Sequence, residues 1–351
     1  MDLTRQLQHQ VTCAIADRRP LKIIGGGSKH FYGRDSIGTV LEVGSHQGIV
    51  EYQPSELVVT VRSGTPLMEL EEALMQEGQM LGFEPPHFGP ATVGGMVAAG
   101  LSGPRRPFTG AVRDFILGVK ILTGRGEVLS FGGQVMKNVA GFDLSRMMAG
   151  SLGTLGLILE VSLKVMPLPE REVTLCLEMP PQGVLEAMSR LMGRSLPLSA
   201  IAYEEPFLTI RLSGTGAAVA ETAKELGGDL IDDGDRYWRE LREQTLSFFN
   251  EGEADLWRLA VAPASPLADL PGRWLLDWGG GQRWLRTTAP AEAVFSTAQA
   301  VGGHATLFRT HGRRDQVFQP LPRELAKLHR ALKQAFDPQR IFNPGRMYED
   351  L

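Results

Sequence analysis

The sequence is poor in cysteine: Cys13 and Cys176 are the two in 351 residues, and they lie far apart without a C-x-x-C spacing. Two such thiols cannot supply the ligands of a zinc centre, and they provide no disulfide framework of the kind that stabilises small secreted proteins. The first twenty residues also lack the apolar core of a secretory signal, because Arg5, His9 and Asp17 interrupt them. We therefore expect a protein without a metal site, in a reducing, cytoplasmic compartment.

Strong charge and long apolar runs are absent as well. The formal net charge is −4, and no block of like charges indicates a polybasic patch or an acidic tail. The longest weakly charged stretch, residues 83–103, is rich in glycine and proline and contains Glu84 and His87. That composition is typical of a loop and not of a membrane span. The sequence thus predicts neither a nucleic-acid partner nor direct membrane insertion.

The two most common nucleotide-binding motifs are also missing. The apolar run at residues 21–24 leads into Gly25-Gly26-Gly27-Ser28-Lys29, but a G-x-G-x-x-G fingerprint would need a glycine at position 30, which is His30. No glycine in the chain is followed by lysine, so a P-loop is absent too. Any nucleotide cofactor would have to be bound by another fold.

Apolar residues make up 43% of the chain, which is enough for two domains. The first half predicts a helix over residues 3–15 and another after Thr65-Pro66. The expected strands are 21–24, 57–61, 116–122, 128–130 and 155–165, with a hairpin turn at 124–126. Residues 85–110 are expected to form a long loop without regular structure. Pro167 and Pro169 predict a domain boundary, because paired prolines end both helices and strands.

From residue 171 onward the pattern becomes β-α-β-β-α-β, which is typical of an antiparallel sheet with helices on one face. A second, looser series of helices and strands follows, and a helix is expected over residues 321–336. We predict an α+β fold with a first domain at 1–170, a second at 171–320 and a C-terminal segment at 321–351.

Three glycine-rich stretches carry most of the chemical information: residues 25–29, 92–106 and 150–156. Consecutive glycines after a strand expose backbone N–H groups that suit a pyrophosphate, and the small side chains of the second stretch suit a large planar ligand. Each stretch alone could be a plain turn, and the second could be a tight helix-to-sheet packing site. Our hypothesis is that all three converge on one two-headed cofactor. A branched side chain at Gly26 would then occupy the place of the pyrophosphate.

The order of these motifs resembles a known family. Residues 61–67 (Val-Arg-Ser-Gly-Thr-Pro-Leu), residues 113–118 and the three glycine stretches are similar to the flavin domain of the vanillyl-alcohol oxidase and p-cresol methylhydroxylase family. More narrowly, four motifs resemble the E subunits of bacterial glycolate oxidases: residues 84–87, 103–107, 135–141 and 342–348. The resemblance extends over about residues 18–170 and resumes at the C-terminus.

The resemblance implies a two-subdomain FAD-binding domain of the PCMH/VAO type, an α/β cap domain with an antiparallel sheet, and a C-terminal segment that returns to the FAD domain. The FAD-binding residues it implies are Gly25, Gly26, Gly27, Ser28 and Lys29 at the pyrophosphate, Thr92, Val93, Gly94, Gly95, Gly100 and Gly103 along the flavin, and Gly153, Gly156 and Ile158 near the adenosine. Many relatives attach the flavin covalently through a histidine in the first loop. Because Gly27-Ser28 take that place here, we expect non-covalent FAD.

By the same resemblance the substrate is a small 2-hydroxy acid such as glycolate or D-lactate. Its carboxylate needs a cation and its hydroxyl proton needs a base. The candidates are Arg105, or its neighbour Arg106, for the carboxylate and His304 for the proton, although each could instead be a surface or structural residue. The H-x-G-D-G-N-x-H motif of flavoproteins that oxidise D-2-hydroxy acids is absent. The chemistry could therefore take place on a partner subunit.

Three functions are compatible with the sequence. The one we favour is a flavoprotein component of a glycolate oxidase complex, with a larger paralogous flavin subunit and an iron–sulfur subunit as partners; any attachment to the inner membrane would be peripheral and through those partners. The second is a self-sufficient flavin oxidoreductase for another small acid or alcohol. The third is a non-catalytic scaffold subunit that binds flavin weakly or not at all. Flavin retention and its reduction by substrate in the isolated chain distinguish the three.

Overall fold

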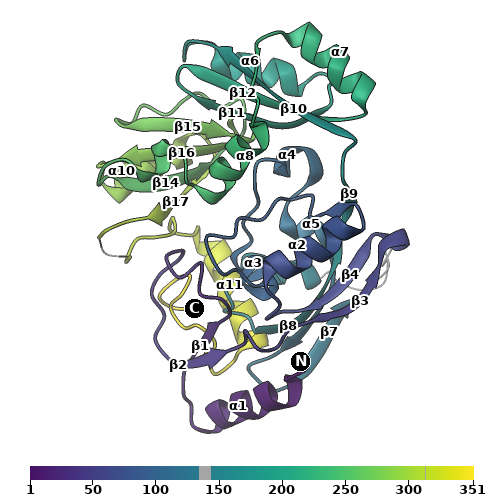
Figure 1. Cartoon of the computed structure of the whole chain (residues 1–351). Coiled ribbons are helices and arrows are strands. Elements are labelled where there is room, and N and C mark those ends of the chain that lie inside the picture. Colours follow the sequence, from purple (N-terminus) through teal and green to yellow (C-terminus); the bar gives the residue numbers. More distant parts are fainter. Residues whose placement is uncertain (134–143, 313) are drawn as a thin grey trace. The chain divides into compact units, whose positions relative to one another are not determined.

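The computed structural model describes residues 1–133, 144–312 and 314–351 (Figure 1). The motif at residues 135–141 lies outside the described residues. The chain divides into two compact units, of which unit 1 comprises Met1–Leu101, Ala111–Leu168 and Pro320–Leu351. Unit 2 comprises Ser102–Gly110 and Pro169–Gln319. Ser102–Gly110, a part of the predicted range 1–170, is thus grouped with unit 2.

Within the described ranges, unit 1 contains a five-stranded antiparallel sheet in the order β3-β4-β8-β6-β7. Its strands are β3 (Ile49–Gln53), β4 (Val58–Arg62), β6 (Ile116–Leu122), β7 (Val128–Gly132) and β8 (Leu157–Lys164). The central strand β8 is largely buried on both faces, in agreement with its nearly continuous apolar sequence. Smaller elements of unit 1 are the pair β5 (Gln79–Met80) and β9 (Met166–Pro167) and the turns η1 (Pro54–Glu56) and η2 (Ser145–Met148).

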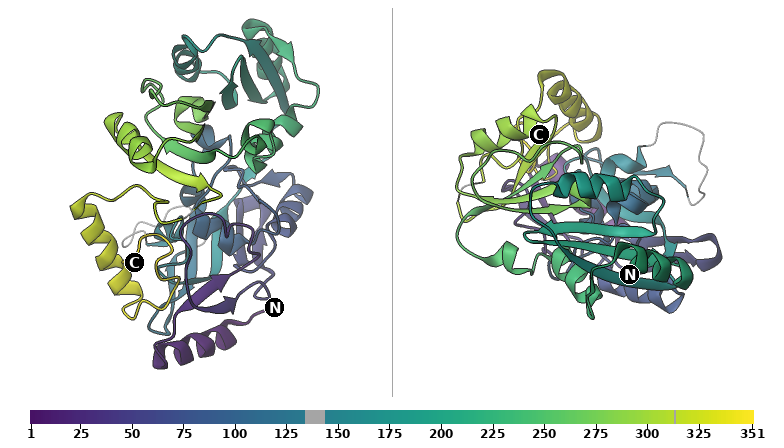
Figure 2. Two further views of the ribbon diagram at one scale, coloured as in Figure 1. Left: turned by 90° about the vertical axis from the view of Figure 1, so that its left-hand side faces the viewer. Right: turned by 90° about the horizontal axis from the view of Figure 1, so that it is seen from above.

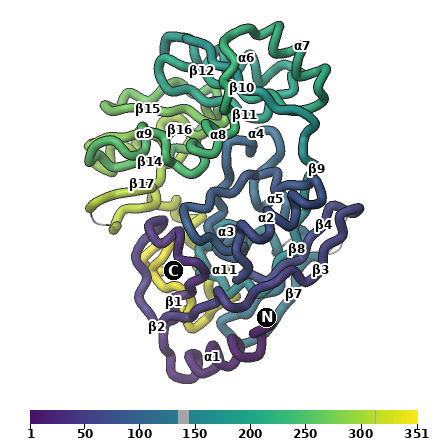
Figure 3. Tube along the Cα trace, viewed as in Figure 1, coloured from purple at the N-terminus to yellow at the C-terminus, as the bar shows by residue number. Residues whose placement is uncertain are grey.

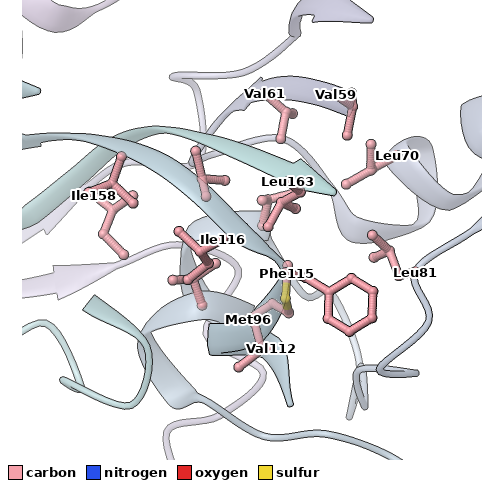
Figure 4. Packing of buried hydrophobic residues seen from close by; sticks show 14 of the residues in the cluster. Val59, Val61, Leu70, Leu81, Met96, Val112, Phe115, Ile116, Ile158 and Leu163 are labelled. Atoms are coloured by element: carbon pink, nitrogen blue, oxygen red, sulfur yellow. The ribbon is translucent and has the colours of Figure 1, made fainter. Parts of the chain in front are cut away.

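One face of this sheet packs against α2 (Leu67–Gln76), α3 (Val93–Ala99) and α5 (Val112–Phe115). Figure 4 shows side chains from both layers, Val61 and Leu163 from strands and Leu70 and Met96 from helices, in one buried cluster. Burial of each such side chain stabilises the fold by about 1.5–3 kcal/mol. This cluster therefore holds α3 firmly against the sheet.

The N-terminal helix α1 (Thr4–Ala16) belongs to a second buried cluster, which includes Leu157 and Leu159 from β8. Its buried residues Leu7, Val11 and Ala14 have the spacing of one helical face. The parallel pair β1 (Leu21–Ile24) and β2 (Thr39–Glu42) contributes to the same cluster. Figure 2 shows α1 and this strand pair in purple within unit 1. The cluster positions the loop that follows β1.

The chain ends with α11 (Arg323–Phe336) and an extended segment that runs along β1. The Leu21 N–H donates to the Ile341 carbonyl over 2.6 Å, and the Asn343 N–H donates to the Leu21 carbonyl over 2.9 Å. Figure 3 shows this yellow segment beside the purple β1. Residues more than 300 positions apart in sequence thus form one wall of unit 1.

A buried ion pair joins α11 to this segment. Lys333 Nζ lies 2.8 Å from Asp337 Oδ2 and also donates to the carbonyls of Thr154 (2.7 Å) and Phe342 (2.9 Å). The two side chains are 3% and 0% exposed. Burial lowers the pKa of Lys333, and the charge of Asp337 opposes that shift. The pair fastens the C-terminal segment to the third glycine-rich stretch.

Within the described ranges, unit 2 contains an eight-stranded antiparallel sheet in the order β13-β10-β12-β11-β15-β16-β14-β17. Its first half consists of β10 (Arg171–Glu178), β11 (Leu198–Glu204), β12 (Phe207–Gly214) and β13 (Asp229–Leu230), packed with α6 (Val184–Met192) and α7 (Gly216–Leu226). Its second half consists of β14 (Asp255–Ala260), β15 (Arg273–Asp277), β16 (Gln282–Thr287) and β17 (His304–Arg309), packed with α10 (Ala291–Ala300). Its other elements are α8 (Gly234–Glu243), α9 (Ser247–Asn250) and η3 (Trp278–Gly280).

The α+β class is confirmed, and so is the β-α-β-β-α-β order at the start of unit 2. The expectation of an irregular stretch over residues 85–110 was wrong, because α3 and α4 (Arg106–Thr109) lie there. The Thr92 hydroxyl caps α3 by accepting from the Gly95 N–H over 3.3 Å. Burial of Met96 and Val97 adds to this cap, and together they outweigh the low helix propensity of the glycines.

Candidate functional site

Unit 1 contains an open cleft, whose empty space of about 840 Å³ includes space open to solvent. Most of its lining comes from four parts of unit 1: the β1 strand and its following loop, helix α3, the loop that leads into β8 together with the start of β8, and the C-terminal segment. Val43, after β2, and Ser63, after β4, complete it. The lining residues are 22–30, Ser36, Val43, Ser63, Thr92, Gly94, Gly95, Ala98, Ala99, Leu152, Gly153, 156–158, Asn343 and Arg346. All three glycine-rich stretches therefore reach one cleft.

The loop after β1 places mainly backbone at the cleft. Gly27 has a φ of +73°, in the left-handed region that favours glycine. Gly26 is required for a different reason, since a Cβ there would lie 1.5 Å from the Pro90 carbonyl oxygen. The sequence suggested that Gly26 leaves space for a pyrophosphate. The structure gives another reason, because a side chain at this position would collide with the backbone of Pro90. Lys29 Nζ donates to Ser28 Oγ (3.3 Å) and to the His87 carbonyl (3.0 Å), so a positive charge lies beside the loop.

The glycines of the second stretch have two roles. A Cβ at Gly94 would lie 2.6 Å from Ser63 Cβ, and a Cβ at Gly100 would lie 2.7 Å from the Gly150 backbone. These two positions let segments of the chain pack closely, which is the alternative that the sequence left open. Gly94 and Gly95 also line the cleft. The stretch is therefore a tightly packed helix with one face on the cleft.

Two side chains of the C-terminal segment hold the cleft together. Asn343 Nδ2 donates to the Leu152 carbonyl (2.8 Å), and its Oδ1 accepts from the Ile23 N–H (2.8 Å). Arg346 donates to four carbonyls of the loop after β1, at 2.6 Å for Tyr32, 2.9 Å for Arg34, 3.2 Å for Lys29 and 3.3 Å for His30. Because both residues bridge separate segments, they keep the loops of the cleft in place.

Most of the predicted cofactor-binding residues line this cleft: Gly25, Gly26, Gly27, Ser28, Lys29, Thr92, Gly94, Gly95, Gly153, Gly156 and Ile158. Val93 instead lies in the hydrophobic core, and Gly100 packs against Gly150. Gly103 belongs to unit 2, where its carbonyl accepts from Trp278 Nε1 over 2.9 Å. The sequence assigned no role to Ser63, Asn343 or Arg346. All three lie within the motifs at residues 61–67 and 342–348, and these motifs could have identified them as cleft residues.

Ser63 indicates that the cleft is built for a polar ligand. Its side chain is 1% exposed, and its Oγ has no hydrogen-bond partner among the described residues. Leaving a buried hydroxyl unsatisfied costs about 1–3 kcal/mol. A molecule in the cleft would supply the missing partner, so the residues present fit a cofactor that carries polar groups.

The predicted carboxylate-binding residue Arg105 lies in unit 2 and is 5% exposed. Its Nη2 is 2.9 Å and 2.6 Å from the two carboxylate oxygens of Glu172, and its Nη1 is 3.0 Å from Ser213 Oγ. Arg211 lies 3.4 Å from the same carboxylate. Arg105 would have to break this ion pair to bind a substrate. The prediction for Arg105 is therefore corrected to a structural role.

The predicted base His304 is the first residue of β17, and its side chain is exposed. Desolvation by the neighbouring protein and then the charge of Arg258 lower the pKa of its imidazole. A neutral imidazole can accept a proton, as a base must. Its role as a base stays a prediction.

Two further expectations concern membranes and metals. No helix in the described ranges is long and apolar enough to cross a membrane. The same residues contain no group of three or more histidine, cysteine, aspartate or glutamate side chains placed to hold a metal ion.

Family models match both ends of the chain. The model described as FAD binding domain matches residues 3–132, and the model of the C-terminal domain of FAD linked oxidases matches residues 292–347. The second match includes Asn343 and Arg346. Most residues that line the cleft thus lie within these two matches, and Leu152, Gly153 and residues 156–158 lie outside them.

Individual proteins are also similar to this chain. The glycolate oxidase subunit GlcE of Escherichia coli (strain K12) is 47% identical over 351 residues, which cover 100% of this chain and 99% of that protein. The glycolate oxidase subunit GlcD of Bacillus subtilis (strain 168) is 32% identical over 138 residues, 39% of this chain and 29% of that protein. The structure of p-cresol methylhydroxylase superposes with a TM-score of 0.72 at 16% identity, covering 100% of this chain and 88% of that one. This last similarity concerns the fold alone.

Proposed function

Because the chain belongs to the family of the glycolate oxidase subunit GlcE, we propose that it is the FAD-binding subunit of a glycolate oxidase complex. The complex would oxidise glycolate to glyoxylate, or D-lactate to pyruvate, and pass the electrons on to partner subunits. The chain is an oxidoreductase component with FAD as its cofactor. The observation that carries the proposal is the single cleft onto which all three glycine-rich stretches converge.

The cleft residues suggest how FAD would be held. The backbone of residues 25–28, with Lys29 beside it, would bind the pyrophosphate, because N–H donors and an ammonium suit its charge. Gly95 and its neighbours on α3 would lie along the flavin side, and Gly153, Gly156 and Ile158 near the adenosine. Bound FAD would supply a redox centre that takes up electrons and passes them on within the complex. We propose that it is bound non-covalently, since Gly27-Ser28 occupy the place of the attachment histidine of relatives.

The partners belong to the same proposal. The similarity to GlcD of Bacillus subtilis supports a larger paralogous flavin subunit, and an iron–sulfur subunit would carry the electrons onward. We propose that hydride transfer from glycolate takes place on the larger subunit, and the absence of the H-x-G-D-G-N-x-H motif from this chain supports that assignment. Any attachment to the inner membrane would be peripheral, through these partners.

Anaerobic titration with glycolate tests this proposal. The chain purified alone should retain FAD, release it on acid precipitation, and show little bleaching of the flavin absorbance. Addition of the partner subunits should give rapid bleaching. A chain that retains no FAD would contradict the proposal, and a chain that bleaches its own flavin with another small acid would be the self-sufficient oxidoreductase.

Removal of the Ser63 hydroxyl should weaken FAD binding without destabilising the protein. We expect Ser63→Ala to lower FAD affinity about 3- to 10-fold, the effect of one lost neutral hydrogen bond. The FAD-free protein should be at least as stable as before, because an unsatisfied buried hydroxyl is removed. Fluorescence titration with FAD and urea denaturation of the FAD-free protein measure the two effects.

Ser162→Ala is the matched control, since Ser162 Oγ is buried in the five-stranded sheet but is paired with Thr60 Oγ1 at 2.8 Å. It should cost stability and leave FAD affinity unchanged. Equal FAD affinity of the Ser63 variant and the original protein would remove Ser63 from the binding site.

A further inference from the structure

In unit 2, two arginine side chains lie near one tryptophan, and a histidine lies on the strand beside one of them. The guanidinium carbon of Arg106 lies 4.2 Å from the centre of the Trp278 ring, and that of Arg258 lies 5.2 Å from it. His304 follows on the neighbouring strand. The register pairs Arg258 with Thr306 and Ala260 with His304, so Arg258 and His304 share one face of the sheet.

Hydrogen bonds hold this group in a defined geometry. Trp278 has a φ of +55°, its N–H donates to Asp277 Oδ1 (2.7 Å), and its ring Nε1 donates to the Gly103 carbonyl (2.9 Å). Gln282 Nε2 donates to Asp277 Oδ2 (3.0 Å), which fixes the orientation of the amide. The Gln282 Oε1 then accepts from Arg258 Nε (2.6 Å). Because each contact orients the next, the Trp278 ring and the Arg258 guanidinium are held in place before any ligand binds.

The charge of Arg258 is not balanced by a direct ion pair. Among the residues that the structure describes, its one side-chain hydrogen bond is to the neutral amide of Gln282, and no carboxylate lies within ion-pair distance. Arg105 and Arg273, in contrast, pair with Glu172 and with Glu204. A half-buried guanidinium that no carboxylate neutralises is unfavourable unless an anion binds to it. The positive charge of Arg258 also lowers the pKa of His304, in agreement with a guanidinium that no carboxylate neutralises.

We propose that Arg106, Arg258 and His304 form a binding site for a small monocarboxylate, with the Trp278 ring as its wall. The planar guanidinium of Arg258, held through Nε, presents its outer N–H groups to the two oxygens of a carboxylate. The indole face provides an apolar surface for a short carbon chain. The choice of a 2-hydroxy acid as the ligand rests on the proposed function, whereas the site itself rests on this geometry.

The test is a ligand-observed NMR titration of the full chain with sodium glycolate at constant ionic strength. We expect saturable binding that is at least 10-fold weaker in Arg258→Gln, the loss expected for a hydrogen bond to a charged group. Arg106→Gln should also weaken binding, and Arg258→Lys should retain part of it because the charge remains. Arg190→Gln, an exposed residue of α6 that is paired with Glu186, is the control and should bind as the original protein does.

The flavin content of each variant, read from its absorbance, separates this inference from the proposed function. Normal flavin with unchanged glycolate binding in Arg258→Gln and Arg106→Gln would overturn the site and leave the proposed function standing. Competition by sulfate as strong as by glycolate would overturn the assignment to a carboxylate. Loss of binding in these variants in a chain that holds no flavin would support the site and contradict the proposed function.

Discussion

Gly26→Ala should destabilise the FAD-free protein and also abolish tight FAD binding. The added Cβ would lie 1.5 Å from the carbonyl oxygen of Pro90, and this oxygen belongs to the backbone and not to a flexible side chain. Relief of such a contact requires the loop after β1 or the segment before α3 to move, and overpacking of this kind costs about 1–3 kcal/mol or more. Since both segments lead into residues that line the cleft, FAD affinity should fall at least 10-fold.

Urea denaturation of the FAD-free variant distinguishes the two possible reasons for this glycine. If Gly26 left room only for a pyrophosphate, the FAD-free protein would keep its full stability. Our prediction is that it does not. Gly44→Ala is the matched control, because the nearest neighbour of its Cβ would be the Gly25 carbonyl at 3.8 Å, an ordinary contact. That variant should unfold and bind FAD as the original protein does.

Asp337→Asn should have the other large effect, a decrease of about 3–5 kcal/mol in the free energy of unfolding. The substitution leaves Lys333 buried with an uncompensated charge, and it weakens the bonds that Asp337 accepts from the N–H groups of Ile341 (3.1 Å) and Phe342 (2.8 Å). The segment that begins at these residues carries Asn343 and Arg346. FAD binding should therefore weaken together with stability.

The defect of Asp337→Asn should depend on pH. Burial already lowers the pKa of Lys333, and loss of the aspartate charge lowers it further. A lysine whose pKa is lower in the folded state binds fewer protons there than in the unfolded chain, so stability rises with pH. The variant should regain stability as the pH increases from 7 toward the pKa of an unfolded lysine, about 10.4.

Urea denaturation between pH 7 and pH 10 measures this recovery. Lys327→Ala on the same helix is the control, since Lys327 and Glu324 form an exposed pair and such pairs contribute about 0–1 kcal/mol. A loss below about 1 kcal/mol in Asp337→Asn at pH 7 would show that the buried pair does not hold the C-terminal segment.

The sequence alone was sufficient for several elements and for the residue types at the cleft. Apolar periodicity located α1, β1 and the β6–β7 hairpin, because side chains alternate or repeat with the geometry of each element. The glycine-rich stretches indicated a cofactor, since a sequence shows directly where side chains are missing. The same pattern predicted an irregular stretch over residues 85–110 and missed α3 there, because the Thr92 cap and burial against the sheet overcame the low helix propensity of Gly94 and Gly95.

The partners of individual charged and polar side chains were decided by the tertiary structure. Arg105 and Arg106 are neighbours in sequence, yet one is buried against Glu172 and the other lies over Trp278. The hydroxyl of Ser63 has no partner among the described residues, and Asn343 bonds to Ile23 and Leu152, which are 320 and 191 positions away in the chain. Local sequence determines backbone conformation and the pattern of burial through short-range sterics and periodicity. A charge or hydrogen bond is satisfied by whatever the fold brings close to it, and that proximity exists only after long-range packing.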